Sequence, residues 1–254
     1  MIVLSYGITK SGSTLAFELC KALLEARGHR QRRLPDHTVA PRHSVNFMVR
    51  PTPARLLALL DAVPATECIA IKLHGALPIE SENLLRNAAI QSQFCVQVSY
   101  RDPREICLSL RDAGAQCRAR EPEATRGFGT IHTLEQAAAF AGPQLTHCRQ
   151  WAALPGALPL YYEDVAFTPE ATLQRMSHQL GLAPLEAAEQ AAVIKAVFEH
   201  THTQRNKAVR ARHCAELTAA ESESLLDAMP IARDFIERAC LRRDYAWLAD
   251  AAHD

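Results

Sequence analysis

Residues 2–14 of this chain read IVLSYGITKSGST, and this stretch decides the fold. Its apolar part, Ile2–Tyr6, predicts a buried strand, residues 7–14 predict a polar turn, and residues 15–27 (LAFELCKALLEAR) predict a helix. In α/β proteins such a turn between a strand and a helix binds phosphate, because the first N–H groups and the dipole of the helix favour an anion. Lys10 adds a positive charge at the same place.

Further apolar runs along the chain predict strands at residues 68–74, 94–100 and 158–162. Strands separated by helices imply an α/β fold with a central, mostly parallel sheet flanked by helices. The chain of 254 residues shows no repeat and no low-complexity linker, so we expect a single domain, 1–254.

The sequence also predicts where helices and irregular segments lie. Helical patterns cover residues 15–27, 53–63, 80–91, 103–119, 134–154 (interrupted near Gly142 and Pro143), 168–181 and 184–198, and further helices begin at 218 and 230, the last running to 253. Irregular segments are expected near residues 29–52, 120–133 and 200–213.

The composition excludes several classes of protein. Lys+Arg and Asp+Glu both total 28, so the net charge does not favour nucleic acid or an anionic membrane as a partner. No apolar run approaches the ~20 residues of a membrane-spanning helix. The 8 cysteines form no CxxC pair and no zinc-binding spacing, and several lie in apolar runs, which is typical of reduced core residues in a cytoplasmic protein.

Polar side chains follow every predicted strand. They lie in Ser5–Thr14, Lys72–His74, Arg101–Ser109 and Tyr161–Asp164. In parallel sheets, ligands bind beyond the carboxyl ends of the strands. We therefore expect these segments to form one site.

The first of these segments is an unusual phosphate loop. A nucleotide-binding P-loop reads GxxxxGK[ST], whereas here Lys10 precedes Gly12. The ordinary ATP or GTP pattern is therefore absent. A surface turn with a solvated lysine is the alternative, but the position between strand and helix favours phosphate binding. The candidate ligands are Lys10, Ser11, Gly12, Ser13 and Thr14.

The second segment places Lys72 and His74 two residues apart at the end of a strand, so both side chains share one face. His74 can accept a proton near neutral pH, and Lys72 can stabilise charge on a departing phosphate oxygen. A histidine at a strand end is also commonly a surface or hydrogen-bonded residue, and both interpretations stay open.

The third segment offers the forked cation of Arg101 and the hydroxyl of Ser109 to a second anionic group. Alternatively, Arg101 pairs with Asp102 or Glu105, and Ser109 is an ordinary helix residue. Asp102 and Glu105, three residues apart around a proline, also form a capping-box pattern at the start of a helix.

In this order, the motifs resemble those of the cytosolic-type sulfotransferases, which use 3′-phosphoadenosine 5′-phosphosulfate (PAPS). The matching segments are the loop Thr9–Thr14, the K-x-H motif Lys72–His74, the segment Arg101–Ser109, the Y-E-D motif Tyr162–Asp164 and the pattern Pro169–Leu182. The resemblance implies a P-loop-like sulfotransferase fold. It also implies transfer of a sulfuryl group from PAPS to a hydroxyl or amine of a small-molecule or carbohydrate-like acceptor, with release of 3′,5′-ADP and without a metal.

The resemblance also assigns roles to residues. It implies that Lys10 and the loop hold the 5′-phosphate, that His74 is the catalytic base, that Arg101 and Ser109 grip the 3′-phosphate, and that Tyr162 lies near the adenine. In this mechanism Lys72 supports the departing oxygen.

Some positions depart from the family pattern. Thr9 replaces a proline, and Leu15 replaces an aromatic residue. The basic segment near the C-terminus lacks the usual glycine, so Arg205, Lys207 and Arg210 are all candidates for the 3′-phosphate, with surface charge as the alternative. Walls for the acceptor are expected in 29–52, 120–133 and 134–154, which contain Phe47, Met48, Phe128 and His132.

Two other functions stay open. A nucleotide kinase or related P-loop phosphotransferase shares the strand–loop–helix start, but it should show GK[ST] and a magnesium carboxylate. A non-enzymatic nucleotide-binding protein is the other alternative. The sequence leaves open whether the chain is a monomer or a homodimer.

Overall fold

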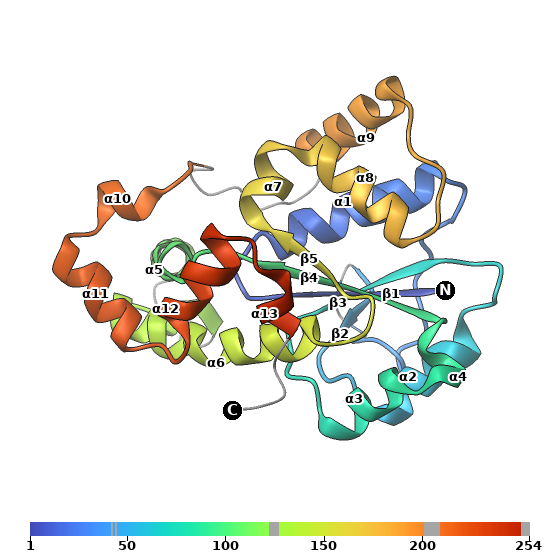
Figure 1. Ribbon diagram of the computed structural model, residues 1–254, viewed down its shortest axis with the longest axis horizontal. Helices are drawn as coiled ribbons and strands as arrows, with labels where there is room; N and C mark the ends of the chain where they lie inside the picture. Colours follow the sequence, from blue (N-terminus) through green and yellow to red (C-terminus); the bar gives the residue numbers. More distant parts are fainter. Residues whose placement is uncertain (42, 44, 122–126, 201–208, 250–254) are drawn as a thin grey trace.

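The computed structural model describes residues 1–41, 43, 45–121, 127–200 and 209–249. Within them, five strands form one sheet in the order β2-β3-β1-β4-β5, and every neighbouring pair runs parallel (Figure 1). The strands are β1 (Ile2–Gly7), β2 (Phe47–Met48), β3 (Ile69–Leu73), β4 (Phe94–Tyr100) and β5 (Leu158–Tyr161). The predicted single-domain α/β architecture with a central parallel sheet is confirmed.

Helices cover both faces of the sheet (Figure 1). The α-helices are α1 (Ser13–Ala26), α2 (Pro53–Ala62), α3 (Ile79–Arg86), α4 (Ala88–Gln91), α5 (Pro103–Arg120), α6 (Leu134–Ala152), α7 (Tyr162–Phe167), α8 (Pro169–Gln179), α9 (Ala187–His200), α10 (Arg212–Glu216), α11 (Ala219–Asp227), α12 (Ala232–Asp234) and α13 (Tyr245–Ala249). A 3₁₀ turn spans Gly127–Thr130, and a π-helical turn spans Phe235–Leu241.

The central strand β1 is buried on both faces. Val3 packs into the hydrophobic cluster beneath α1, α8 and α9, whereas Ile2 and Leu4 join the larger cluster beneath α2, α3 and α6. This split follows from the alternation of side chains along a strand. Tyr6 stacks on Trp151 of α6 at 5.4 Å between ring centroids. Burial on both faces explains the continuous apolar run, and it anchors the loop that follows β1.

Strand β2 lies inside the segment 29–52, where we expected only irregular structure, so that expectation is wrong at Phe47–Met48. The segment has no apolar periodicity, and hydrogen bonds between side chains and the backbone fix its conformation. The Asn46 side chain accepts from the Leu34 amide at 3.0 Å and donates to the Arg32 carbonyl at 2.9 Å. These bonds bring β2 alongside β3.

Helix α6 continues through Gly142 and Pro143, where we expected an interruption. Proline removes one backbone donor from the helix. Tertiary packing outweighs this loss, because Ala141 and Leu145 are fully buried on either side of it, and Gly142 lies close to Met229.

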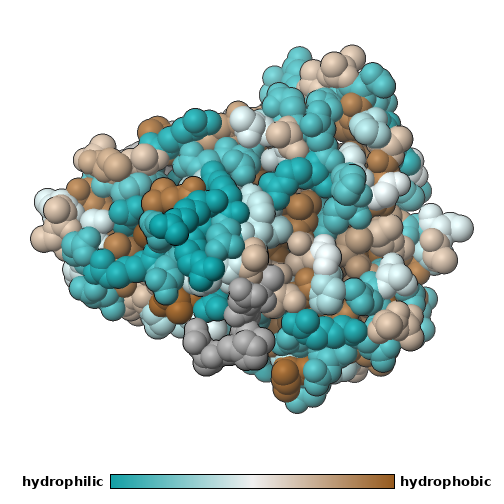
Figure 2. Space-filling model, in the orientation of Figure 1, coloured by the Kyte–Doolittle hydropathy of each residue, from teal (hydrophilic) through white to brown (hydrophobic). Residues whose placement is uncertain are grey.

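The expected helix over 230–253 is broken in the structure. The π-helical turn Phe235–Leu241 ends before Arg243, whose φ of 56° is left-handed. Asp244 then starts α13 by accepting from the Trp247 amide at 3.0 Å, and it also accepts from Arg238 at 2.7 Å. Hydrophilic residues gather on the face formed by this C-terminal part (Figure 2).

In the described part of the chain, no helix combines the length and the apolar character that crossing a membrane requires. All 8 cysteines are free: Cys20, Cys68, Cys107, Cys148 and Cys240 are buried, Cys95 and Cys117 are half-buried, and Cys214 is exposed. The core placement expected for the cysteines in apolar runs therefore holds for Cys20, Cys68 and Cys107 and is wrong for Cys95, which is only half-buried.

Candidate functional site

The loop between β1 and α1 has a backbone that fits its sequence. Lys10 and Gly12 both adopt left-handed conformations, with φ of 69° and 80°. The Ser11 hydroxyl donates to the Ser99 carbonyl of β4 at 3.1 Å, so this side chain fixes the loop to the sheet. Helix α1 begins at Ser13, and its first N–H groups therefore lie at the carboxyl edge of the central strand.

Tyr162 closes one side of this loop. A Cβ atom at Gly12 would lie 2.5 Å from Cδ2 of the Tyr162 ring, so only glycine allows this contact. The Arg101 guanidinium lies over the same ring, with Cζ 3.9 Å from its centroid, which is a close cation–π contact. The ring thus joins the end of β4 to the loop between β1 and α1.

Lys72 and His74 both reach the same loop from the end of β3. The Lys72 ammonium donates to the Thr14 hydroxyl at 2.6 Å, and Nδ1 of His74 lies 2.6 Å from the Gly7 carbonyl. A carbonyl oxygen can only accept, so Nδ1 carries the proton. In the neutral ring, Nε2 is then an acceptor.

Burial shifts the pKa values of these groups. It lowers the pKa of His74 to about 4 and that of Lys72 to about 8. The pKa of Lys10 is also lowered, first by burial and then by the positive charge of Arg101. At neutral pH, the His74 ring is therefore uncharged, whereas Lys72 beside it is still mostly protonated.

Arg101 is buried and forms an ion pair with Glu105 at 3.0 Å, as one of the alternatives predicted. Its Nε atom is also buried and has no hydrogen-bond partner among the described residues. Ser109 is buried one helical turn beyond Glu105 on α5, and therefore on the same face. A buried guanidinium N–H without a partner is costly, and an anion would satisfy it.

The predicted capping box at Asp102 and Glu105 is half right. Asp102 caps α5 by accepting from the Arg104 amide at 2.9 Å. Glu105 does not complete the box, because its carboxylate binds Arg101 and His213 instead.

Of the three basic candidates near the C-terminus, Arg205 and Lys207 lie outside the described residues. Arg210 is described and exposed. Its Nε lies 3.4 Å from the Glu163 carboxylate, and its guanidinium lies 4.4 Å from the Phe167 ring centroid. Burial raises the pKa of Glu163, and the charges of Arg101 and then Arg210 oppose that shift. Arg210 thus contacts the Y-E-D segment.

Two of the residues expected in the acceptor walls lie beside the candidate catalytic groups. The ring centroids of Phe47 and His74 are 5.8 Å apart, and the Lys10 ammonium lies 5.7 Å from the centroid of Phe128. Met48 is fully buried and His132 is exposed.

A contact network that the sequence did not predict joins α5 to α10. Glu105 accepts from His213, which lies 108 residues away, and Arg212 donates to Asp112 at 2.8 Å. Of these contacts, the sequence raised only the pairing of Arg101 with Glu105, as one alternative. Arg101 precedes α5, so helical periodicity does not predict even this contact.

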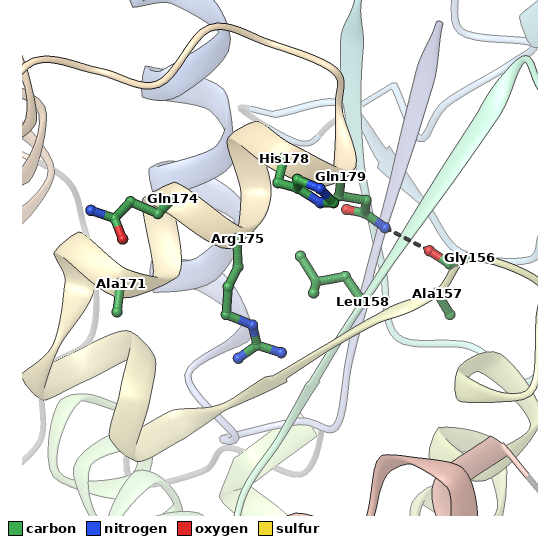
Figure 3. A pocket seen from close by; sticks show the side chains of 8 residues that line it. All are labelled: Gly156, Ala157, Leu158, Ala171, Gln174, Arg175, His178 and Gln179. Carbon is green, nitrogen blue, oxygen red and sulfur yellow. Dashed lines mark hydrogen bonds between the residues drawn. The ribbon is translucent and has the colours of Figure 1, made fainter.

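A separate open cavity of about 770 Å³ lies between β5 and α8, lined by Leu158, Arg175 and Gln179 among others (Figure 3). It contains none of the predicted site residues. Its polar groups serve the fold, since Arg175 donates to the Pro159 carbonyl at 2.7 Å and Gln179 to the Gly156 carbonyl at 2.9 Å. The candidate site at the carboxyl edge of the sheet is therefore the one considered for function.

Within the described ranges, no cluster of three or more His, Cys, Asp or Glu side chains is arranged to hold a metal ion. A comparison with protein-family models finds no match to this chain, and a comparison with curated proteins finds none either. The function is therefore argued from the site itself.

Proposed function

We propose that this protein is a sulfotransferase with a P-loop-like fold that moves a sulfuryl group from PAPS to a hydroxyl or amine. One observation carries the proposal: the four polar segments at the strand ends converge at one edge of the sheet and contact each other. Lys72 binds Thr14, His74 binds Gly7, and Tyr162 contacts both Gly12 and Arg101.

The phosphate loop and Arg101 are suited to the two ends of the donor. The start of α1 and the charge of Lys10 favour the 5′-phosphosulfate. The unpartnered Nε of Arg101 and the buried hydroxyl of Ser109 offer donors to the 3′-phosphate. Tyr162 gives a ring surface between the two positions. A loop that binds a 5′-phosphosulfate, with the 3′-phosphate bound separately at Arg101, need not have the lysine after the glycine as an ATP-binding loop does.

His74 is suited to the chemistry of transfer. The acceptor oxygen or nitrogen attacks sulfur, the bond from sulfur to the bridging oxygen breaks, and the acceptor's proton passes to Nε2 of His74. The Gly7 carbonyl holds the ring in the required tautomer. Lys10 and Lys72 carry positive charge at the loop, where the negative charge of the departing 3′,5′-ADP develops. The sulfuryl acceptor is a small-molecule or carbohydrate-like compound.

Labelled PAPS and a panel of hydroxylated and amine acceptors test the proposal directly. In parallel, calorimetry compares 3′,5′-ADP with ATP, with and without magnesium. We expect 3′,5′-ADP to bind without a metal, and label to appear on at least one acceptor. Magnesium-dependent ATP binding without 3′,5′-ADP binding would instead indicate a nucleotide kinase. Donor binding without transfer to any acceptor would favour a non-enzymatic nucleotide-binding protein.

A further inference from the structure

Glu105 stands between the candidate anion site and the C-terminal part of the chain. Its side chain is 2% exposed. One carboxylate oxygen accepts from Arg101 at 3.0 Å. The other accepts from both the backbone amide of His213 at 2.8 Å and Nδ1 of its ring at 2.7 Å. A single buried carboxylate therefore serves two partners that are far apart in sequence.

A second anchor lies two turns further along the same face of α5. The side chain of Arg212 is 3% exposed and donates to Asp112 at 2.8 Å. Helix α10 is thus fixed to α5 at Glu105 and at Asp112, and Ser109 lies between these two anchors on the same face. The docking of α10 and the surroundings of Arg101 are parts of one polar network.

We propose that Glu105 is a positioning residue that couples anion binding at Arg101 to the docking of α10. This inference rests on the proposed function, because the anion is taken to be the 3′-phosphate of the donor. Without an anion, Glu105 neutralises Arg101. A phosphate at Arg101 neutralises the guanidinium in its place. Both oxygens of the Glu105 carboxylate are then available to accept hydrogen bonds from His213.

The sign of the coupling follows from charge. The carboxylate of Glu105 repels an incoming phosphate and competes with it for Arg101. The hydrogen bonds from His213 favour a position of the Glu105 carboxylate in which it no longer binds Arg101. Glu105 then competes less with the phosphate for the Arg101 guanidinium. By reciprocity, if docking of α10 strengthens anion binding, anion binding must strengthen docking of α10 by the same factor.

Substitution with glutamine separates the two contacts of Glu105. An amide has only one accepting oxygen, and its NH₂ group only donates. With its oxygen toward His213, a glutamine would turn its NH₂ group toward Arg101. Arg101 would then lack its counter-charge. We expect E105Q to bind 3′,5′-ADP about tenfold more tightly, since a unit negative charge beside the anion has been removed.

A double-mutant cycle tests the coupling by calorimetry with 3′,5′-ADP. H213A should weaken binding about threefold to tenfold, because the carboxylate then competes more strongly for Arg101. In E105Q/H213A the loss at His213 should vanish, so the double variant should match E105Q to within about twofold. His213 is less buried than Glu105, so the single variant H213A should stay folded and its binding can be measured even if E105Q unfolds more readily.

Hydrogen exchange supplies a readout that a purely structural role would not change. Addition of 3′,5′-ADP should slow exchange of the α10 amides in the natural protein and leave it unchanged in E105Q. Glu67→Gln is the matched control. Glu67 pairs with Arg32 at 2.9 Å, and its carbonyl binds the amino group of Met1 at the opposite edge of the sheet, so this variant should bind 3′,5′-ADP like the natural protein.

The outcomes distinguish this inference from the proposed function. If the natural protein binds 3′,5′-ADP but E105Q binds it more weakly, or if the two substitutions are additive, the coupling is overturned while the proposed function stands. If the natural protein does not bind 3′,5′-ADP at all, the proposed function is overturned and the coupling with it.

Discussion

The neutral imidazole of His74 is the group that the proposed reaction depends on most. A positioned general base contributes about 10²–10⁴-fold to turnover, so H74A should lower kcat by that factor. Binding of 3′,5′-ADP should be nearly unchanged, because the His74 ring contacts the Gly7 carbonyl rather than Arg101. Transfer of labelled sulfate and calorimetry measure the two effects separately. H178A, at an exposed position on α8, is the control and should behave like the natural protein.

The shifted pKa values predict the pH profile. The base must be unprotonated, so kcat/KM should fall as the pH drops through about 4, the pKa of His74. The Lys72 ammonium must be protonated, so kcat/KM should also fall as the pH rises through about 8. Between these limits the profile should be flat. A rate profile over this range measures both limbs, and a fall centred near 6.5, the ordinary pKa of histidine, would contradict the buried environment of His74.

At the scale of elements, the turn between β1 and α1 depends on Gly12 for two reasons. Its φ of 80° is left-handed, and a Cβ there would meet the Tyr162 ring at 2.5 Å. Gly28, at the end of α1, has a similar φ of 84° but open space around it. Comparing alanine at the two positions separates backbone strain from the clash.

We expect G28A to lower the free energy of unfolding by about 1 kcal/mol, from backbone strain alone. G12A should lower it by about 2 to 4 kcal/mol, since the ring must also move. Only G12A should weaken 3′,5′-ADP binding. Urea unfolding and calorimetry measure both effects. Equal losses of stability in the two variants would show that the contact between Gly12 and Tyr162 is unimportant.

The elements that the sequence predicted well are those with strong periodicity. The central strands are apolar over their length because both faces are buried, and Phe94–Tyr100 matches its predicted bounds. Strand β2 has two residues, too few for any pattern to show. Pro143 misled the prediction for α6, because burial of the neighbouring helix turns outweighs one missing donor. Local sequence determines the helix or strand propensity of a segment. The formation of β2 and the continuation of α6 through Pro143 depend instead on contacts with distant segments.

The same distinction applies to the candidate site. The sequence made Lys10, Lys72, His74 and Arg101 candidates because each lies at or just beyond the carboxyl end of a predicted strand, the edge where ligands bind in parallel sheets. It did not predict that Glu105 binds His213, since no spacing links residues that are 108 positions apart. It also could not predict the pKa of His74, which depends on burial by the whole fold.

At the scale of the molecule, the site exists only when the whole sheet is assembled. Its groups come from the carboxyl ends of β1, β3, β4 and β5, which lie far apart along the chain, and α10 contacts them through Glu105. A ligand that bridges these segments must therefore stabilise the folded state as a unit, because the unfolded chain cannot bind it. Thermal unfolding is then a test of the proposed donor as well as of the fold.

At a concentration 100 times its Kd, 3′,5′-ADP should raise the free energy of unfolding by about 2.7 kcal/mol. For a chain of this size that corresponds to a rise in Tm of roughly 5 to 10 °C. AMP with only the 5′-phosphate, at the same concentration, should give a much smaller rise, because it offers Arg101 no 3′-phosphate and leaves the buried Nε unpartnered. Scanning calorimetry with both nucleotides measures the difference. Equal shifts for the two would mean that Arg101 does not recognise the 3′-phosphate, and the donor would then have to be a different nucleotide.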